Sequence, residues 1–312
     1  MHRIGIIGAG EISHRHIERI RRIPDFEFSG LLDINRDHTN PDSVINAFPT
    51  FNSLEELIEK SDIVDIAGRH IPHFNLASQA LRRSRHVFID RPLMGSLMEM
   101  QKLTKLAFEA DVKVQIGHAE RYNPAFTLVR DYIDQPGYIE ARRSMPLDAN
   151  HQDIDVVMDM MIHDIDIILS LVDSGIKRIK ARGHSLDGQK LSMVHAHIEF
   201  DNGCIANLNS SKMAGGEEAL LQIYQAERSF VLDLKHGRVE QILYNTTNGR
   251  EERNVLRVDK NAFDPLRSGL ESLRRAITDN TAPYVSLIDG SNALEVAFTI
   301  LDKVAHWQGM NG

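Results

Sequence analysis

A carboxylate and an imidazole stand one helical turn apart in the segment DMMIHDID. Asp159 precedes His163 by four residues and Asp166 follows it by three, so a helix would place all three near one face. A carboxylate beside an imidazole orients the ring and stabilises its protonated form, as a general base accepting an alcohol proton requires. A solvated helix face and a mixed nitrogen and oxygen metal site are the alternatives, and the metal site lacks a second histidine or a cysteine cluster.

A second set of residues has the spacing of a dinucleotide site. In GAGEIS, Gly8 allows a tight turn, Gly10 lets a pyrophosphate approach a helix N-terminus, and the small Ser13 permits close packing. Asp33 ends the next apolar run, where it would accept hydrogen bonds from both ribose hydroxyls and repel a 2'-phosphate. The pattern therefore predicts NAD, with NADP less favoured even though Arg36 would accommodate its extra phosphate. A tight turn without a ligand is the alternative.

The elements that must position these residues alternate between strand and helix in the first third of the chain. Short β-branched runs predict strands at 3–8, 26–33, 62–68, 86–90 and 112–117. Amphipathic segments between them predict helices at 12–22, 53–60, 73–84 and 96–110. This order predicts a doubly wound parallel sheet of the Rossmann type, which binds ligands at the carboxyl ends of its strands.

The remainder of the chain has a different pattern. A helix over 154–172 is followed by long alternating runs with turn signals in FDNGC and LKHGR, which predict a mostly antiparallel open sheet. Helices near 263–278 and 289–307 close the chain. We therefore expect an α/β Rossmann domain at 1–118 and an α+β domain for substrate binding and oligomerisation at 119–312, with the last helix in this domain or packed back on the first.

Composition excludes several classes of protein. The chain has 312 residues, a net charge of -8 and 42% hydrophobic residues, values typical of a globular protein that does not bind nucleic acid. Charged residues interrupt the longest apolar stretch, so no membrane span is expected. Cys204 is the only cysteine, which excludes an intramolecular disulfide and favours the cytoplasm.

Three stretches together resemble the Gfo/Idh/MocA oxidoreductases: GIIGAGEIS, HVFIDRPLMGSLMEMQKL and DMMIHDIDIIL. The resemblance implies an NAD(P)-dependent reaction on a sugar-type hydroxyl or ketone. The stretches VQIGHAERYNPAF and FDNGCIANLNSSK resemble a subgroup that oxidises the 3-hydroxyl of UDP-N-acetylglucosamine.

The resemblance also assigns roles by position. The family's Glu-Lys-Pro motif falls on Asp90-Arg91-Pro92, whose proline is a candidate for a cis peptide, and its catalytic acid and histidine fall on Asp159 and His163. Arginine stays charged, so Arg91 cannot act as a base in place of the family's lysine, although it can hold a substrate oxygen. The proton-transfer role therefore moves to His163.

The remaining candidates follow from position along the predicted sheet. The predicted cofactor-binding residues are Gly8, Gly10, Glu11, Ile12, Asp33, Arg36, Gly68, Arg69, His73, Asp90 and Arg91. The predicted substrate-binding residues are His118, Glu120, Arg121, Tyr122 and His163, the first four of which are equally suited to an interdomain hinge. Arg69 would either reach a cofactor phosphate or occlude the site. His195 and His197 alternate along one strand, so they share a face that lines either substrate or an oligomer interface.

Two functions compete at this stage. The first is an NAD-dependent oxidoreductase that moves hydride between nicotinamide and a hydroxyl of a sugar or nucleotide sugar, with UDP-N-acetylglucosamine C3 as the candidate position. His163, Arg91 and Asp159 are its predicted catalytic residues. The second is a catalytically weak NAD-binding sensor that has lost the lysine. For the enzyme, the expected partner is a small-molecule sugar or nucleotide-sugar substrate, with no nucleic acid or membrane partner. A homo-oligomer, a dimer or tetramer formed through the second sheet, is also expected.

Overall fold

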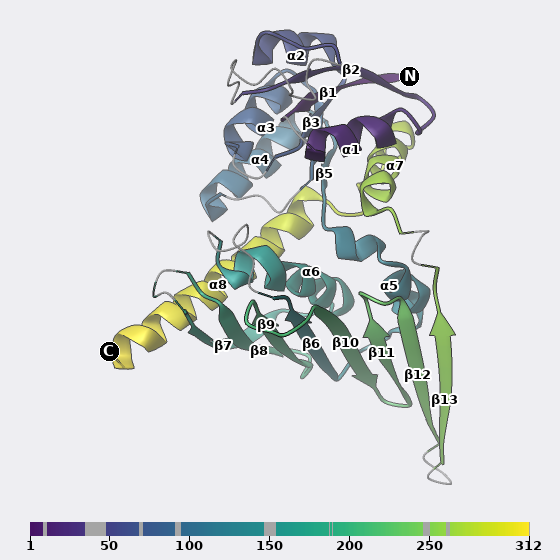
Figure 1. The fold of residues 1–312 in the computed structure, drawn as a ribbon, viewed down its shortest axis with the longest axis vertical. Helices are drawn as coiled ribbons and strands as arrows, with labels where there is room; N and C mark the ends of the chain where they lie inside the picture. Colours follow the sequence, from purple (N-terminus) through teal and green to yellow (C-terminus); the bar gives the residue numbers. More distant parts are fainter. Residues whose placement is uncertain are drawn as a thin grey trace. The chain divides into compact units, whose positions relative to one another are not determined.

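The computed structural model describes residues 1–8, 11–34, 48–68, 71–90, 95–146, 154–186, 188, 190–245, 250–259 and 263–311, without the side chains of 245 and 308–311. The chain forms two compact units (Figure 1). The first unit comprises Met1–Ala119 and Asp264–Ser291, and the second comprises Glu120–Phe263 and Asn292–Gly312.

The first unit contains a parallel sheet of five strands in the order β2-β1-β3-β4-β5. The strands are β1 His2–Ile7, β2 Phe26–Leu32, β3 Ile63–Ile66, β4 His86–Ile89 and β5 Val114–Ile116. Every residue of β3 is buried, as expected for a strand covered on both faces. The predicted Rossmann architecture is confirmed.

The first unit also contains helices, not all of which begin with a capping side chain. They are α1 Glu11–Ile20, α2 Leu54–Lys60, α3 His73–Arg82, α4 Leu97–Glu109 and α7 Pro265–Thr278. Ser96 and Glu99 form a reciprocal capping box at the start of α4. Asp264 caps α7 by accepting a hydrogen bond from the backbone N–H of Arg267.

Helix α7 belongs to the first unit, whereas the sequence places it in the second. Its apolar face explains the difference, because Leu270 and Leu273 are fully buried in one cluster with Ile17 and Ile20 of α1. Burial of this kind contributes about 1.5 to 3 kcal/mol per large aliphatic side chain. The first unit is therefore assembled from two separate segments of the chain.

The second unit contains a sheet of eight strands in the order β13-β12-β11-β10-β6-β9-β8-β7. The strands are β6 Tyr138–Ser144, β7 Ile176–His184, β8 Met193–Phe200, β9 Ile205–Ser211, β10 Glu218–Gln225, β11 Arg228–Asp233, β12 Arg238–Asn245 and β13 Arg250–Arg257. All neighbours are antiparallel except β6 and β9. Gly203 (φ 89°) and Gly237 (φ 62°) adopt left-handed backbone conformations at the two turns that the sequence predicts.

Helical segments of the second unit include a π-helix where a continuous α-helix was expected. They are the 3-10 helices η2 Ala119–Tyr122 and η3 Arg130–Tyr132, α5 Pro124–Val129, the π-helix η5 Val157–Met161, α6 Ile162–Leu171 and α8 Leu287–Asn311. The first residue of η2 and the first five of α8 fall in the first unit. π-helical turns are rare and occur frequently at functional sites. Within the described residues, no helix is both long and apolar enough to span a membrane.

Candidate functional site

Residues predicted to bind the cofactor gather at one edge of the first unit's sheet. Gly8 follows β1, Asp33 follows β2, Gly68 lies two residues past β3, and Asp90 follows β4. All four strands are parallel, so their carboxyl ends lie at the same edge, where sheets of this type bind dinucleotides. Gly10, Arg36, Arg69, Arg91 and Pro92 lie outside the described residues.

The turn at Gly8 fits a dinucleotide because only glycine can occupy it. Its φ is 137°, and a Cβ atom there would stand 2.1 Å from the carbonyl oxygen of Ala67. Helix α1 begins soon after the turn, at Glu11, so its first N–H groups point toward the edge. Ile12 packs on the core cluster of this unit, so its side chain supports the turn from within.

His73 closes the turn after β3. Its Nε2 is 2.9 Å from the carbonyl oxygen of Gly68, and its Nδ1 has no hydrogen-bond partner among the described residues. Burial lowers the pKa of His73, outweighing the Gly68 hydrogen bond and the charge of Asp90. The ring is therefore neutral at physiological pH, and Nε2–H donates to Gly68.

Asp90 belongs to an ion-pair cluster that was not predicted from the sequence. His16 Nδ1 is 2.7 Å from Asp65 Oδ2, and His16 Nε2 is 3.6 Å from Asp90 Oδ1. Two features of the sequence indicate it: His16 stands on the apolar face of α1, and Asp65 interrupts a strand that is otherwise apolar.

The helical segment with the predicted catalytic residues has a cation that was not predicted from the sequence. Lys212 Nζ is 3.0 Å from Asp159 Oδ2, and it also donates a 2.7 Å hydrogen bond to the carbonyl of Ile154. The two charged side chains are 4% and 6% exposed. Asp159 lies in η5 and His163 one turn later in α6. The structure therefore places a charge-neutralised carboxylate one turn before the predicted base.

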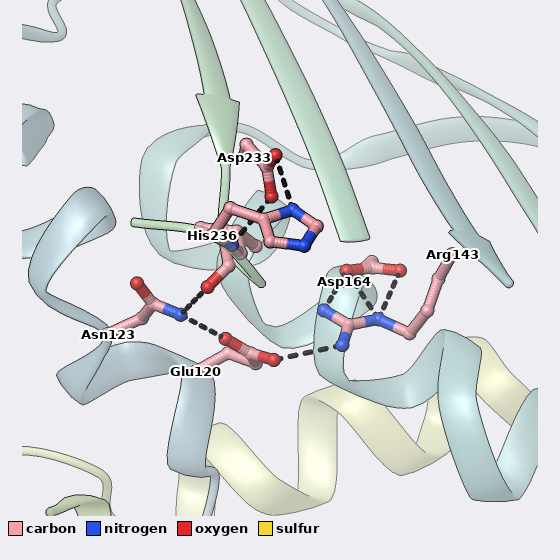
Figure 2. A network of polar contacts seen from close by, with 7 residues as sticks. Glu120, Asn123, Arg143, Asp164, Asp233 and His236 are labelled. Atoms are coloured by element: carbon pink, nitrogen blue, oxygen red, sulfur yellow. Dashed lines mark hydrogen bonds and ion pairs between the residues drawn. The ribbon is translucent and has the colours of Figure 1, made fainter. Parts of the chain in front are cut away.

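Glu120 belongs to a polar network within the second unit, shown in Figure 2. Arg143 of β6 contacts Glu120 Oε1 at 2.9 Å and Asp164 Oδ1 at 2.7 Å. Asn123 donates to Glu120 Oε2 and to the carbonyl of Leu234. Burial would lower the pKa of Arg143, but Asp164 and Glu120 outweigh it and raise that pKa. The network joins η2, α5, β6 and α6, so Glu120 has a demonstrable structural role beside its predicted one.

Arg121 and Asp166 form another buried ion pair. Arg121 Nε is 2.7 Å from Asp166 Oδ2, and Arg121 Nη2 is 3.2 Å from Asp166 Oδ1. The predicted metal alternative required Asp159 and Asp166 as ligands, but each carboxylate binds a cationic side chain. No group of three candidate ligands for a metal occurs among the described residues.

The other predicted residues occupy varied environments. His118 is fully buried after β5 in the first unit, and Tyr122 is half-buried in η2 of the second. His195 and His197 share the outward face of β8, where their Nδ1 atoms lie 2.9 and 2.8 Å from the side-chain oxygens of Asn209 and Asn207. Their substrate or interface roles stay predictions.

The fold and these two sets of residues define an NAD-binding oxidoreductase with a Rossmann unit and a sheet-based second unit. Residues 2–118 match the oxidoreductase family with an NAD-binding Rossmann fold, and residues 130–240 match the GFO/IDH/MocA C-terminal domain. The chain therefore belongs to the Gfo/Idh/MocA family.

Relatives of this chain include dehydrogenases of sugar derivatives and of inositol. The chain is 26% identical over 307 residues to UDP-N-acetylglucosamine 3-dehydrogenase of Acidithiobacillus ferrooxidans, covering 96% of each chain. It is 24% identical over 347 residues to glucose-6-phosphate 3-dehydrogenase of Bacillus subtilis, covering 100% of this chain and 99% of the relative. A solved structure of the Acidithiobacillus enzyme superposes with a TM-score of 0.88 at 25% identity over 97% of each chain.

Proposed function

We propose that the protein oxidises a secondary hydroxyl of a nucleotide sugar with NAD, and that the 3-hydroxyl of UDP-N-acetylglucosamine is the candidate position. The main support is the similarity to a dehydrogenase of that substrate over 96% of both chains. The Asp159 and His163 pair on the helix of the second unit supplies the general base that such an oxidation requires. Gly8 and Asp33 fit the pyrophosphate and ribose of the dinucleotide.

Within this proposal, each residue has a separate role. NAD, when bound, supplies the acceptor for the hydride. His163 takes the proton of the hydroxyl, and Asp159 orients its ring from one turn away. Arg91 holds the substrate oxygen as a fixed positive charge.

Lys212 makes His163 available as a base. A buried carboxylate needs one nearby cation, and Lys212 supplies it to Asp159 at 3.0 Å. The imidazole of His163 is then not required as the counter-ion of Asp159.

A direct assay tests this proposal. The protein with NAD and UDP-N-acetylglucosamine should generate NADH absorbance, and glucose 6-phosphate and myo-inositol should give slower rates. His163→Ala should lower kcat by at least about 10², the scale of losing a general base. His236→Ala, on the exposed turn between β11 and β12, is the matched control and should keep full activity. No NADH with any nucleotide sugar, or full activity of His163→Ala, would contradict the proposal.

The sensor alternative is not favoured, because full-length relatives are dehydrogenases. Arg91→Lys separates the two functions. If Arg91 is adapted to catalysis, Arg91→Lys should lower the turnover. If the wild-type protein is almost inactive and Arg91→Lys raises its turnover, the result would support a sensor derived from an enzyme.

We further infer that a second copy of this chain covers the outward face of the eight-stranded sheet. Helix η5 packs on one face at β9, and the opposite face carries half-exposed apolar side chains such as Val231, Ile242 and Val255. Light scattering after gel filtration should give a dimer or larger assembly. Ile242→Lys should dissociate it, and a monomeric wild-type protein would contradict this inference.

A further inference from the structure

His16 is buried between two carboxylates behind the cofactor edge of the first unit. Its side chain is 2% exposed, that of Asp65 is 0% exposed, and that of Asp90 is 24% exposed. His16 belongs to α1, Asp65 to β3, and Asp90 directly follows β4. One imidazole therefore joins three elements that are far apart in the sequence.

The ring is charged. Each ring nitrogen faces a carboxylate, and only a doubly protonated imidazolium has an N–H group for both. Burial alone would lower the pKa of His16, but Asp65 and then Asp90 outweigh it and raise the pKa to about 10. Among the described residues these two carboxylates are the charged groups that face the ring, and Phe88 of β4 packs edge-on at 6.1 Å. One imidazolium between two carboxylates leaves the cluster with one negative charge.

The cluster links two parts of the predicted cofactor site. Helix α1 begins at Glu11, after the Gly8 turn, and it carries His16 in its second turn. Asp90 stands at the carboxyl end of β4, directly before Arg91. We propose that His16 is a positioning residue of the cofactor site, which holds the carboxylate of Asp90 against α1 while Asp65 anchors the ring from behind.

The backbone of Asp90 is fixed independently from the side of β5. Gly117 N donates a 2.7 Å hydrogen bond to the carbonyl of Ile89. A Cβ atom at Gly117 would stand 2.1 Å from the carbonyl oxygen of Asp90, a contact with backbone that cannot yield cheaply. The main chain of Asp90 is therefore already set, and the ion pair with His16 acts on its side chain.

A pair of variants separates positioning from simple stabilisation. His16→Gln leaves the carboxylate of Asp65 buried without its cation. The Tm of this variant should therefore be about 10 °C lower than that of the wild type. His16→Gln with Asp65→Asn replaces the buried charges by two amides of similar size, which should restore most of the lost stability. The ion pair between His16 and Asp90 is still absent in this double variant. The Kd of this variant for NADH, measured by NADH fluorescence, should therefore be about tenfold higher than that of the wild type, which corresponds to about 1.4 kcal/mol for the lost ion pair.

Two controls make the result specific. His86 begins β4, at the end of the strand opposite Asp90, and accepts a hydrogen bond from Lys113 N. His86→Gln should lower Tm without changing the Kd for NADH. Asp90→Ala should raise this Kd about tenfold alone and cause no further rise in the His16→Gln, Asp65→Asn background, because both changes remove the same interaction.

Several outcomes would overturn the proposal. A folded double variant with wild-type affinity for NADH would reduce His16 to a structural residue, and additive effects with Asp90→Ala would show that His16 does not act through Asp90. NMR of the histidine rings in the wild-type protein gives a test that needs no variant to fold, since His16 should carry both ring protons at pH 8. A neutral ring at that pH would contradict the ion pair. These measurements use no sugar, so they stand apart from the proposed substrate.

Discussion

Removing the ammonium of Lys212 should destabilise the second unit by about 3 to 5 kcal/mol, the usual cost of leaving a buried charge without its partner. Lys212 Nζ and Asp159 Oδ2 are 3.0 Å apart, and both side chains are less than a tenth exposed. With an effective dielectric constant of about 20, unit charges at this separation attract each other by about 5.5 kcal/mol. Lys212→Met also loses the hydrogen bond to Ile154. This variant should therefore be the least stable of the series described next.

Urea unfolding followed by tryptophan fluorescence measures this loss of stability in the second unit. Trp307 is the only tryptophan of the chain, and its ring lies on α8 in the second unit, 5.0 Å from the guanidinium carbon of Arg182. Lys212→Met, Asp159→Asn and the double variant form a cycle whose coupling energy should be about 3 kcal/mol. The double variant should be more stable than Lys212→Met, because it leaves no unpaired buried charge.

An exposed pair in the same unit provides the control for this cycle. Lys235 and Glu217 lie in connections between strands of the second unit, with Nζ and Oε2 2.7 Å apart and side chains 36% and 57% exposed. Their coupling should be much smaller, because water screens the pair. A coupling for Lys212 and Asp159 no larger than that of the control would refute the reasoning that burial makes this pair strong.

Three further predictions concern other parts of the molecule. Gly117→Ala should destabilise the first unit by about 1 to 3 kcal/mol and weaken NADH binding. Gly216→Ala should change neither stability nor NADH binding, because no atom lies within 4 Å of its Cβ position. Urea unfolding and NADH fluorescence titrations measure these two effects. Burial, followed by the charges of His2 and Lys113, lowers the pKa of His86 from 6.5 to about 4. Between pH 6.5 and 4, His86 is therefore protonated in the unfolded chain and neutral in the folded protein. The free energy of unfolding should fall by about 1 to 2 kcal/mol as the pH drops from 6.5 to 4, a value already reduced for solvent screening of the partly exposed ring. His86→Gln should remove this pH dependence. Burial raises the pKa of the Cys204 thiol to about 11. A chromogenic disulfide at pH 8 should label the folded protein about 100-fold more slowly than the urea-unfolded protein, and equal rates would contradict the buried position.

The first unit could be predicted from local pattern because its strands are covered on both faces. Runs such as RIGIIG and DIVDIA place apolar side chains on both sides of each strand, and helices separate them. In the second unit, Tyr138–Ser144 and Arg250–Arg257 were not predicted as strands. Charged residues fill both segments, so β-propensity is low, and pairing with neighbouring strands decides their structure.

The ion pairs could not be predicted in the same way because their partners are far apart in the chain. His16 is 49 residues from Asp65. Lys212 has a signal that sequence alone can provide: Ala206, Leu208 and Ser210 alternate on the buried face of β9, and Lys212 continues this alternation. A lysine at an inward position requires an anion, although the pattern does not reveal that the anion is Asp159.

The division of the chain between its two units has a consequence for recombination and engineering. The sequence passes from one unit to the other after residues 119, 263 and 291. Exchanging the cofactor-binding unit for that of another oxidoreductase therefore needs three breakpoints, since a fragment ending at residue 119 leaves α7 behind and exposes the apolar face of α1 that Leu270 and Leu273 cover. A chain reordered so that residue 119 leads directly into residue 264 would make the first unit one continuous module.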